Sequence, residues 1–507
     1  MARWASLGLA ALLAVGVAGG ARAERACPDL ASVALPHAAV TAATIQTLGL
    51  AAFCRVDVTS RPTADSDIRV ELWIPIGAAW NGKYVQFGNG GFAGSIPTAF
   101  LTAIAERGYA VAATDDGHQT SQGTDAAWAL GHPQKIIDFG WRALKETTDV
   151  SKALIGAMKA RGPARSYFAG CSDGGREALM EAQRYPADFD GIVAGAPAND
   201  FTRLLAFAAQ TQQALLNRPG GYLTAANLSV LQAGALKDCG GEAFIRDPAA
   251  CRFDPASVQC APGQDAGACL TAAQVATARA IYAGLRDPRT GRLVLPGYSP
   301  GGEAQPGAWK SWITGPARDQ AASALISQFA TGFFRDFALG DPGFDILKLD
   351  LGDQFAAIHA RLGPQLDSVD PNLRAFRAHG GKLIGYHGWN DPALPARGSI
   401  VYYEDVRRTL GDVDDFYRLF LVPGMLHCGG GAGPGNVDWL GLLDRWVADG
   451  SAPRAVVAQS GAPGAPPPPG GPSQLLCPYP AVARRFSGPA DAAASYRCEA
   501  PVRDRKS

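Results

Sequence analysis

A serine at the centre of a glycine-flanked turn is the residue of this sequence best placed to do chemistry. Ser172 lies in the run Gly-Cys-Ser-Asp-Gly at residues 170–174, which has the form G-x-S-x-G. A serine hydroxyl is a weak nucleophile without a base, a group that orients the base and donors for the developing oxyanion. Because the chain has 61 glycines, the bare pattern can arise by chance. The elements around it must decide its meaning.

The residues around Ser172 have the pattern of a strand, a sharp turn and a helix. Residues 166–169 form a short apolar strand, and residues 176–180, Arg-Glu-Ala-Leu-Met, favour a helix. Glycines on both sides of the serine suit a strand-to-helix turn in which backbones come too close for side chains. We therefore predict that Ser172 is the nucleophile of an acyl-transfer reaction.

An acid and a histidine follow Ser172 in the order that hydrolases with this turn use, which is Ser, acid, His. One predicted strand ends at His387 and runs into a loop that carries Asp391, and another ends at Val422 and runs into a glycine-rich loop that carries His427. We predict that His427 is the general base and later the general acid. Asp391 would hold its tautomer and stabilise the imidazolium.

Other histidines and aspartates compete for these two roles. His118 follows a predicted strand and His387 lies shortly before Asp391. We prefer His427 because it comes last in the chain order and lies in a glycine-rich turn. We prefer Asp391 because it lies between a strand and a loop. The competing aspartates are Asp367, Asp370, Asp412, Asp414 and Asp415.

Two backbone N–H donors for an oxyanion are expected from two different loops. One should belong to Asp173, the residue after the serine, and the other to Gly90 or Gly91 in the glycine-rich loop 88–94. That loop could instead cradle a phosphate. It lacks the Gly-Lys-Ser/Thr ending and does not open a helix with Walker spacing, so we discount a phosphate site.

A cysteine stands beside both the predicted nucleophile and the predicted base. Cys171 precedes Ser172, and Cys428 follows His427. A disulfide between them would hold the two loops together, since bridged Cα atoms lie about 5–6 Å apart. The alternative is two unrelated buried thiols. The chain has ten cysteines and no CxxC pair, which favours disulfides in an exported protein over zinc or redox use.

The N-terminal residues have the pattern of a secretory signal. Arg3 supplies a positive charge, residues 7–17 are apolar and residues 21–23 read Ala-Arg-Ala. We expect a signal peptide at 1–23, cleaved from a protein that is secreted or periplasmic. The apolar run is shorter than the roughly 20 residues that span a bilayer, so we expect no membrane span after cleavage. Basic and acidic residues number 46 each, which suggests no nucleic-acid partner.

Alternating strands and helices predict an α/β fold with a mostly parallel sheet. Between residues 199 and 365 the alternation gives way to helical patterns, four cysteines and Gly/Pro-rich loops. We predict a catalytic domain made of 24–198 and 366–507, with 199–365 inserted as a lid domain. The predicted strands are 68–75, 84–87, 109–114, 166–169, 191–195, 381–387 and 416–422, with a turn at 81–82.

The sequence resembles the tannase and feruloyl esterase family, whose most specific mark is the pair of cysteines beside the serine and the histidine. The resemblance implies an α/β-hydrolase fold with a large inserted lid domain and a catalytic triad of Ser172, Asp391 and His427. It also implies five disulfides. The stretches that carry the resemblance are 88–94, 170–176, 185–191, 380–395, 416–430 and 477–498. The implied disulfides are Cys27–Cys54, Cys171–Cys428, Cys239–Cys251, Cys260–Cys269 and Cys477–Cys498.

Lids of this family usually carry a calcium loop near the cysteines that match Cys239 and Cys251. That stretch is shortened here, and Asp238, Glu242 and Asp247 are the carboxylates that it offers. Calcium favours six to eight oxygen ligands, so we do not expect a well-formed calcium site. We expect no required cofactor.

Substrate contacts are expected from the lid and from residues near the triad. The cluster Phe333, Phe334, Arg335 and Phe337 could present an aromatic wall and a cation. The more ordinary interpretation is a helix core with a surface arginine. Leu394 is a second candidate for a pocket wall.

The sequence as a whole predicts a secreted serine carboxylic-ester hydrolase whose partner is a small aromatic ester. The resemblance implies feruloyl, galloyl or related acids and an acyl-enzyme. The alternative is a mono(2-hydroxyethyl) terephthalate-type or other polyester-fragment hydrolase, or a peptidase. A rival of a different class is an inactive secreted binding protein on a hydrolase scaffold.

Overall fold

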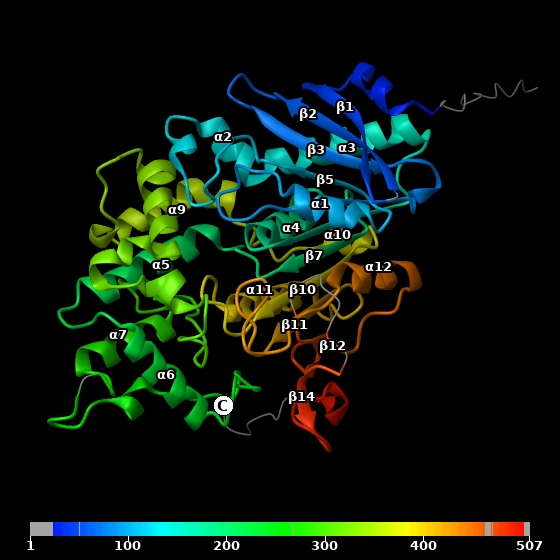
Figure 1. Ribbon diagram of the computed structural model, residues 1–507. Helices are drawn as coiled ribbons and strands as arrows, with labels where there is room; N and C mark the ends of the chain where they lie inside the picture. The colour runs from blue at the N-terminus through cyan, green and yellow to red at the C-terminus, as the bar shows by residue number, and fades with distance from the viewer. Residues whose placement is uncertain (1–23, 50, 266, 462–467, 469, 501–507) are drawn as a thin grey trace, which may run out of the picture.

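A computed structural model describes residues 24–49, 51–265, 267–461, 468 and 470–500. The expected signal peptide at 1–23 lies outside the described residues. A nine-stranded sheet runs through the molecule in the order β1-β2-β3-β5-β4-β6-β7-β10-β11 (Figure 1). Its strands are β1 (Ala38–Leu48), β2 (Ala51–Ser60), β3 (Ile68–Pro75), β4 (Lys83–Phe87), β5 (Ala110–Thr114), β6 (Arg165–Cys171), β7 (Gly191–Gly195), β10 (Lys382–Gly388) and β11 (Tyr417–Val422).

The part of the sheet from β5 to β11 is parallel, as the alternation of strands and helices predicts. Strands β5 and β7 are buried along their whole length, as strands covered on both faces should be. On the other side β1, β2 and β3 pair antiparallel. Strands β3 and β4 follow one another in the chain, but β5 lies between them, so the turn at 81–82 joins no hairpin.

Helices cover both faces of the sheet, because successive strand residues point to opposite sides. On one face, Phe168 and Leu383 join a core packed by α3, α4 and α11. On the other face, Tyr167 and Ile384 join a core packed by α1 and α12. These helices are α1 (Thr98–Ala105), α3 (Ala143–Lys159), α4 (Asp173–Arg184), α11 (Ala396–Leu410) and α12 (Trp439–Asp449).

The segment 199–365 is mainly helical and lies between β7 and β10 in the chain. Figure 1 shows its helices α5, α6, α7 and α9 gathered to one side of the sheet. Its apolar side chains form a core of their own that also takes in Phe92 and Phe139. Its elements are α5 (Phe201–Leu216), α6 (Ala225–Asp238), α7 (Ala272–Ala283), β8 (Leu285–Arg286), β9 (Leu293–Leu295), the π-helical turns η6 (Lys310–Thr314) and η8 (Phe333–Leu339), α8 (Leu325–Gly332) and α9 (Asp353–Leu366).

The remaining elements are short. They are α2 (Pro133–Ile137), the π-helical turn η4 (Asp138–Arg142), α10 (Arg374–Ala378), the strand pair β12 (Val456–Gln459) and β13 (Ser473–Leu476), and the strand pair β14 (Val482–Arg485) and β15 (Tyr496–Glu499). Short 3-10 helices lie at Cys27–Ser32, Gly77–Ala79, Ala127–Ala129, Pro255–Val258, Arg318–Ser323, Ile346–Lys348 and Ala493–Ser495.

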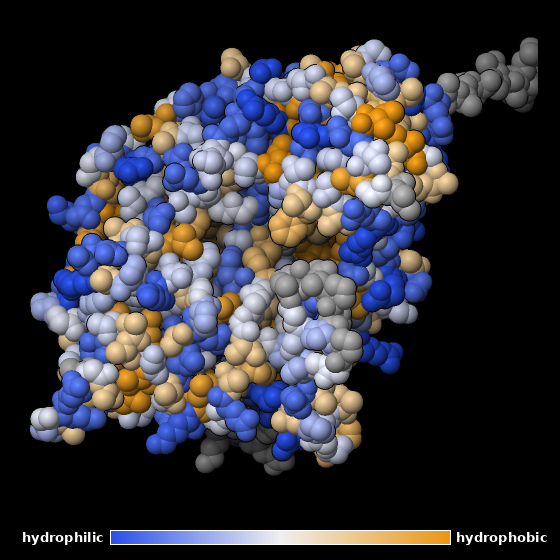
Figure 2. Space-filling view, in the orientation of Figure 1, coloured by the Kyte–Doolittle hydropathy of each residue, from blue (hydrophilic) through white to orange (hydrophobic). Residues whose placement is uncertain are grey.

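The surface that the structure describes is mixed in character. Figure 2 shows hydrophilic and hydrophobic residues interspersed over the visible face. Within the described residues, no helix is both long enough and apolar enough to cross a bilayer.

Candidate active site

Ser172 occupies a strained turn between β6 and α4. Its backbone φ is +66°, a value uncommon outside glycine, and such strain costs of order 1–3 kcal/mol. The flanking glycines permit the turn: a Cβ on Gly170 would lie 2.4 Å from the carbonyl oxygen of Gly174, and a Cβ on Gly174 would lie 2.8 Å from that of Asn89. Ser172 therefore stands at the carboxyl end of β6, where it lines a cavity.

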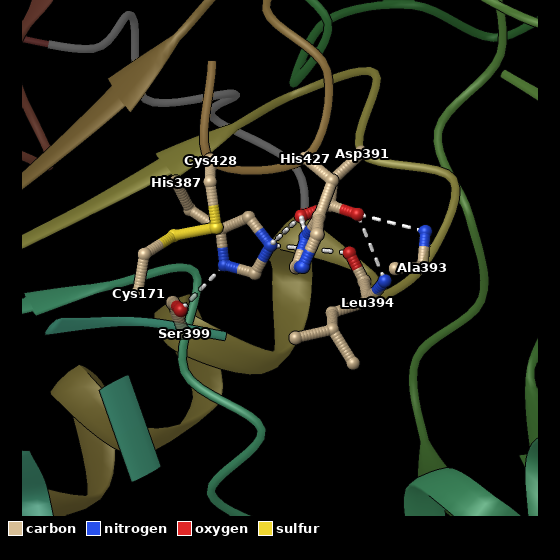
Figure 3. Close-up of a disulfide and its surroundings, with 8 residues drawn as sticks. All are labelled: Cys171, His387, Asp391, Ala393, Leu394, Ser399, His427 and Cys428. Carbon is tan, nitrogen blue, oxygen red and sulfur yellow. Dashed lines mark hydrogen bonds and ion pairs between the residues drawn. A yellow bond between two sulfur atoms is a disulfide. The ribbon is translucent and has the colours of Figure 1, made fainter. Parts of the chain in front are cut away.

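Asp391 lies just beyond β10 and is surrounded by hydrogen-bond donors (Figure 3). Its Oδ1 accepts from the backbone N–H groups of Ala393 at 2.8 Å and Leu394 at 2.9 Å. Its Oδ2 lies 2.7 Å from His427 Nδ1 and 3.1 Å from His387 Nε2. Burial raises the pKa of Asp391, but the charge and N–H donors of the two histidines outweigh it and hold the pKa well below its usual range.

His427 lies in the loop after β11, beside the same cavity as Ser172. Because its Nδ1 faces the carboxylate of Asp391, we assign the Nδ1–H tautomer, which leaves Nε2 with a free lone pair. The ring of Trp312 meets the ring of His427 edge-on, with centroids 5.1 Å apart. The imidazole is thus oriented by a carboxylate and packed by an indole.

His387, a competing base in the sequence, has a different place. The residue is 1% exposed, and its Nδ1 lies 2.8 Å from Ser399 Oγ. Its Nε2 lies within 3.1 Å of both Asp391 Oδ2 and the carbonyl oxygen of Leu394. His387 therefore contacts Asp391 and does not line the cavity. Its spacing of four residues from Asp391 is the one signal in the sequence that could have suggested this.

A disulfide joins Cys171 to Cys428, with Cα atoms 5.9 Å apart and a separation of 257 positions along the chain. Figure 3 shows it beside His427. It ties the end of β6 to the loop after β11, and so it links the neighbours of Ser172 and His427. The structure also contains the other four disulfides that the family resemblance implies, which are Cys27–Cys54, Cys239–Cys251, Cys260–Cys269 and Cys477–Cys498.

The glycine-rich loop after β4 reaches the same cavity. Gly90, Gly91 and Asp173 all line it together with Ser172. Gly91 has a φ of +63°, and a Cβ there would lie 2.4 Å from the carbonyl oxygen of Gly123. Only glycine fits this position, so the loop can bring its backbone close to a bound group.

Helix α4 holds this loop in place through Glu177 and Gly174. The Oε2 of Glu177 accepts the backbone N–H of Asn89 at 3.0 Å. The carbonyl oxygen of Asn89 accepts the N–H of Gly174 at 2.7 Å. The turn at Ser172 and the helix that follows it are therefore docked on the glycine-rich loop through two hydrogen bonds.

A buried cluster of acids that the sequence analysis missed lies behind this contact. Carboxylate oxygens of Asp116, Asp173 and Glu177 lie within 4.8 Å of one another. Arg176 binds Asp173 through Nε at 2.5 Å and a second N–H at 3.1 Å. Burial raises the pKa of Asp116 to about 7, and burial together with the neighbouring acids raises the pKa of Glu177 well above its usual range. One guanidinium faces three carboxyls, so protons neutralise the excess charge.

The cavity beside Ser172 and His427 has a volume of about 350 Å³. Residues from the sheet loops and from the segment 199–365 both contribute to its wall. Leu394 lines it, as the sequence suggests. The apolar lining residues are Phe92, Ala198, Phe201, Leu204, Leu205, Ala208, Trp312, Ile326, Phe329, Ala393 and Leu394.

The aromatic cluster at 333–337 does not form part of this wall, contrary to the suggestion from the sequence. Phe333, Phe334 and Phe337 are at most 3% exposed and pack in the core of the segment 199–365. Arg335 donates to Asp336 at 2.8 Å and lies away from the cavity lining. The ordinary interpretation of a helix core with a surface arginine is the correct one.

His118 and the five competing aspartates do not take the roles of His427 and Asp391 in this structure. His118 stacks on Trp128 with ring centroids 3.7 Å apart, and burial lowers its pKa to about 4. Asp367 accepts the backbone N–H of Thr202 at 2.8 Å. Among the residues that the structure describes, no hydrogen bond joins His427 to any of five other aspartates. These are Asp367, Asp370, Asp412, Asp414 and Asp415.

The three calcium candidates do not converge on one point. Asp238 accepts from Ser257 Oγ at 3.0 Å, and Asp247 pairs with Arg484 at 3.2 Å. Glu242 is exposed. A calcium ion needs six to eight oxygens directed at one centre, so these side chains do not fit one, and we assign no step to calcium.

The fold and the site together are those of a carboxylic ester hydrolase. The family model described as "Tannase and feruloyl esterase" matches residues 54–499. The chain belongs to the tannase and feruloyl esterase family, as its resemblant motifs predict.

Individual relatives agree with this assignment. An uncharacterized esterase of Xanthomonas campestris pv. campestris is 38% identical over 492 residues, covering 86% of this chain and 84% of the relative. A probable feruloyl esterase B-2 of Aspergillus terreus is 30% identical, covering 80% and 78%. The crystal structure of feruloyl esterase B from Aspergillus oryzae superposes with a TM-score of 0.84 at 25% identity, over 93% of this chain and 99% of that one. Esters are therefore the substrates of this enzyme.

Proposed function

We propose that the protein is a serine esterase in which Ser172 is the nucleophile, His427 the general base and acid, and Asp391 the residue that orients His427. The observation that carries the proposal is the 2.7 Å contact between Asp391 Oδ2 and His427 Nδ1, beside a cavity that Ser172 and His427 both line. The strained turn at Ser172 and the chain order Ser, acid, His support it further.

In the proposed reaction, Ser172 Oγ attacks the ester carbonyl carbon while its proton passes to Nε2 of His427. The negative charge that develops on the carbonyl oxygen is stabilised by the N–H of Asp173 and by an N–H of Gly90 or Gly91. Collapse breaks the ester C–O bond, and the leaving alkoxide takes the proton from His427. Water then attacks the acyl carbon and gives its proton to His427. The bond from that carbon to Ser172 Oγ breaks, His427 returns the proton to Oγ, and the acid is released.

We also propose that the sheet and its flanking helices form an α/β-hydrolase domain, made of 24–198 and 366–507, and that 199–365 is its lid. Side chains of α5, η6 and α8 line the cavity beside Ser172, which supports the role of a lid. An inserted element that supplies seven of the 18 residues lining the cavity is well placed to select the substrate.

The proposed substrates are esters of aromatic acids. The cavity has aromatic side chains at Phe92, Phe201, Trp312 and Phe329, which suit stacking with a ring. Relatives are named feruloyl esterases, which favours feruloyl or related acids. Polyester-fragment hydrolysis remains the alternative substrate class.

We infer that the enzyme is exported, either into the medium or into the periplasm, and that residues 1–23 are removed. Five disulfides support an oxidising compartment. A signal-like N-terminal sequence supports the same conclusion.

The experiment that tests the proposed function is turnover of p-nitrophenyl acetate and methyl ferulate by the wild-type enzyme and by Ser172→Ala, with folding checked by circular dichroism. We expect both esters to be hydrolysed by the wild type, and kcat to fall by a factor of about 10⁴ or more in the variant. A folded Ser172→Ala enzyme with wild-type turnover would contradict the proposal.

A further inference from the structure

The cavity beside Ser172 offers a bound ring almost no charge and few hydrogen bonds. Most of its wall is aromatic or aliphatic, including the four aromatic side chains named above. The lining residues with polar side-chain atoms are Ser172, Asp173, Trp312 and His427. Two of these, Ser172 and His427, are assigned to the reaction itself, and the other two decide what else the cavity can bind.

The carboxylate of Asp173 is not available to a ligand. Both of its carboxylate oxygens bind Arg176, and the residue is 1% exposed. Arg176 is not available either. Its other N–H groups donate to the carbonyl oxygens of Gly140 at 2.8 Å and Phe139 at 3.0 Å, and the residue is fully buried.

The indole N–H of Trp312 is then the one side-chain donor left in the cavity lining that the structure describes. No lysine or arginine belongs to that lining. An anionic group that enters the cavity would therefore lose its hydration without gaining a cation. A phenolic hydroxyl would lose water hydrogen bonds and find, besides the two residues assigned to the reaction, at most one side-chain partner.

We propose that the cavity holds the acid part of the ester and that this part is an uncharged, apolar aryl group. Each ionised carboxylate or free phenolic hydroxyl on that ring then lowers kcat/KM. This inference rests on the proposed function, because it assumes that the cavity beside Ser172 holds the acid part of the ester. Among the candidate acids, methoxylated cinnamic acids fit this wall best. Galloyl groups, with three hydroxyls, and terephthalate monoesters, with a carboxylate, fit it worst.

A substrate series tests the proposal through kcat/KM. Methyl 3,4-dimethoxycinnamate, methyl ferulate and methyl caffeate carry zero, one and two free hydroxyls on the same frame. We expect kcat/KM to fall along this series by about tenfold or more in total, because each unpaired buried hydroxyl is unfavourable. We expect monomethyl terephthalate to be at least roughly 100-fold poorer than dimethyl terephthalate, because only the former carries a charge.

A charge introduced into the wall gives a second test. Leu204 lines the cavity from α5, and Leu204→Arg places a cation there, whereas the matched control Leu204→Met keeps the wall apolar. We expect the ratio of kcat/KM for monomethyl over dimethyl terephthalate to rise by about tenfold or more in Leu204→Arg and to stay within about twofold in Leu204→Met.

Three results would overturn the inference: methyl caffeate hydrolysed as well as its dimethoxy analogue, monomethyl terephthalate within tenfold of the diester, or no change of ratio in Leu204→Arg. Its failure is distinguishable from failure of the proposed function. If p-nitrophenyl acetate is hydrolysed by the wild type and not by Ser172→Ala, the proposed function stands whatever the ring preference is.

Discussion

Cys171 and Cys428 are joined by a disulfide with Cα atoms 5.9 Å apart, and each is the chain neighbour of one residue of the proposed triad. Cys171 is the last residue of β6 and precedes Ser172, and Cys428 follows His427 in the loop after β11. A covalent link therefore spans two loops that the fold alone would join only through packing. The distance between nucleophile and base should depend on it.

We expect the double variant Cys171→Ala/Cys428→Ala to lose kcat/KM by about tenfold or more while it remains folded, because small displacements of reacting groups cost large factors in rate. Its Tm should also fall. The bridge closes a very long loop, and in the chain-entropy model this closure stabilises the folded state by up to roughly 5 kcal/mol. The measurements are kcat/KM at one temperature and Tm, both at the same pH for the variant and the wild type.

The matched control for the bridge is Cys477→Ala/Cys498→Ala, which removes the disulfide between the residue after β13 and β15. We expect this control to lower Tm with little change in kcat/KM. Equal losses of kcat/KM in the two double variants would mean that the Cys171–Cys428 bridge has no special role at the site.

The second histidine on Asp391 gives a prediction about pH. In His387→Leu, Asp391 loses the donor at 3.1 Å. A carboxylate with fewer donors attracts the proton on His427 more strongly, so the acid limb of kcat/KM against pH should shift to higher pH. His387→Gln keeps an N–H donor and should restore the limb toward the wild-type position. A lower kcat with an unmoved limb in His387→Leu would assign His387 a purely structural role.

The buried acids behind the nucleophile turn predict how stability depends on pH. Burial raises the pKa of Asp116 to about 7, well above its value of about 4 in an unfolded chain. The folded state then binds this proton more tightly, so the stabilisation is complete below about pH 4 and is lost as pH rises through about 7. Asp116→Asn stays neutral, and asparagine suits the positive φ of +60° at this position.

We therefore expect the Tm of Asp116→Asn, measured relative to wild type, to rise between pH 5 and pH 8. Asp353→Asn is the control, because the Asp353 side chain is 87% exposed, and its Tm difference should stay flat. Parallel profiles for wild type and Asp116→Asn would show that Asp116 is already ionised in the folded protein at pH 5.

Trp312 provides a prediction about the cavity wall. Its ring lies edge-on to His427 and stacks near Phe329. In Trp312→Ala, kcat/KM for methyl ferulate should fall by about tenfold or more, because an aryl group loses a large apolar contact. Turnover of p-nitrophenyl acetate, whose acyl group is small, should fall by a smaller factor, because this ester loses only the packing of Trp312 on His427 and no aryl contact. Trp312→Phe should retain most activity on both esters. Equal losses on the two esters would place the aryl group elsewhere.

Much of the sheet and the site could be predicted from the sequence, because both depend on local patterns. Strands β5, β6, β7, β10 and β11 are short apolar runs, and parallel strands carry such runs. The turn at Ser172 and the loops of Asp391 and His427 follow three of these strands, so all three residues come to the same edge of the sheet. Strands β1 and β2 were not predicted, because most residues of β1 are exposed and small or polar.

The cavity wall and the buried acids could not be predicted in the same way. Phe329 lines the cavity, whereas Phe333, one helical turn later, is buried in the core. Phe329 lies on α8 and Phe333 begins the π-helical turn η8 that follows it, and the sequence does not say which part of this apolar run lines a cavity. Likewise, Asp116 and Glu177 meet only through the packing of a loop after β5 against α4. From the sequence alone, Glu177 on the helix after Ser172 cannot be told from an ordinary exposed polar residue.

The most direct test of the central claim, that Ser172 is the nucleophile, is the mass of the enzyme after reaction with an organophosphonate ester. The account predicts one phosphonyl adduct per chain on the peptide that contains Ser172, formed more slowly in His427→Ala and absent in Ser172→Ala. An adduct on a different residue, or no adduct on the folded wild-type enzyme while it hydrolyses esters, would contradict it.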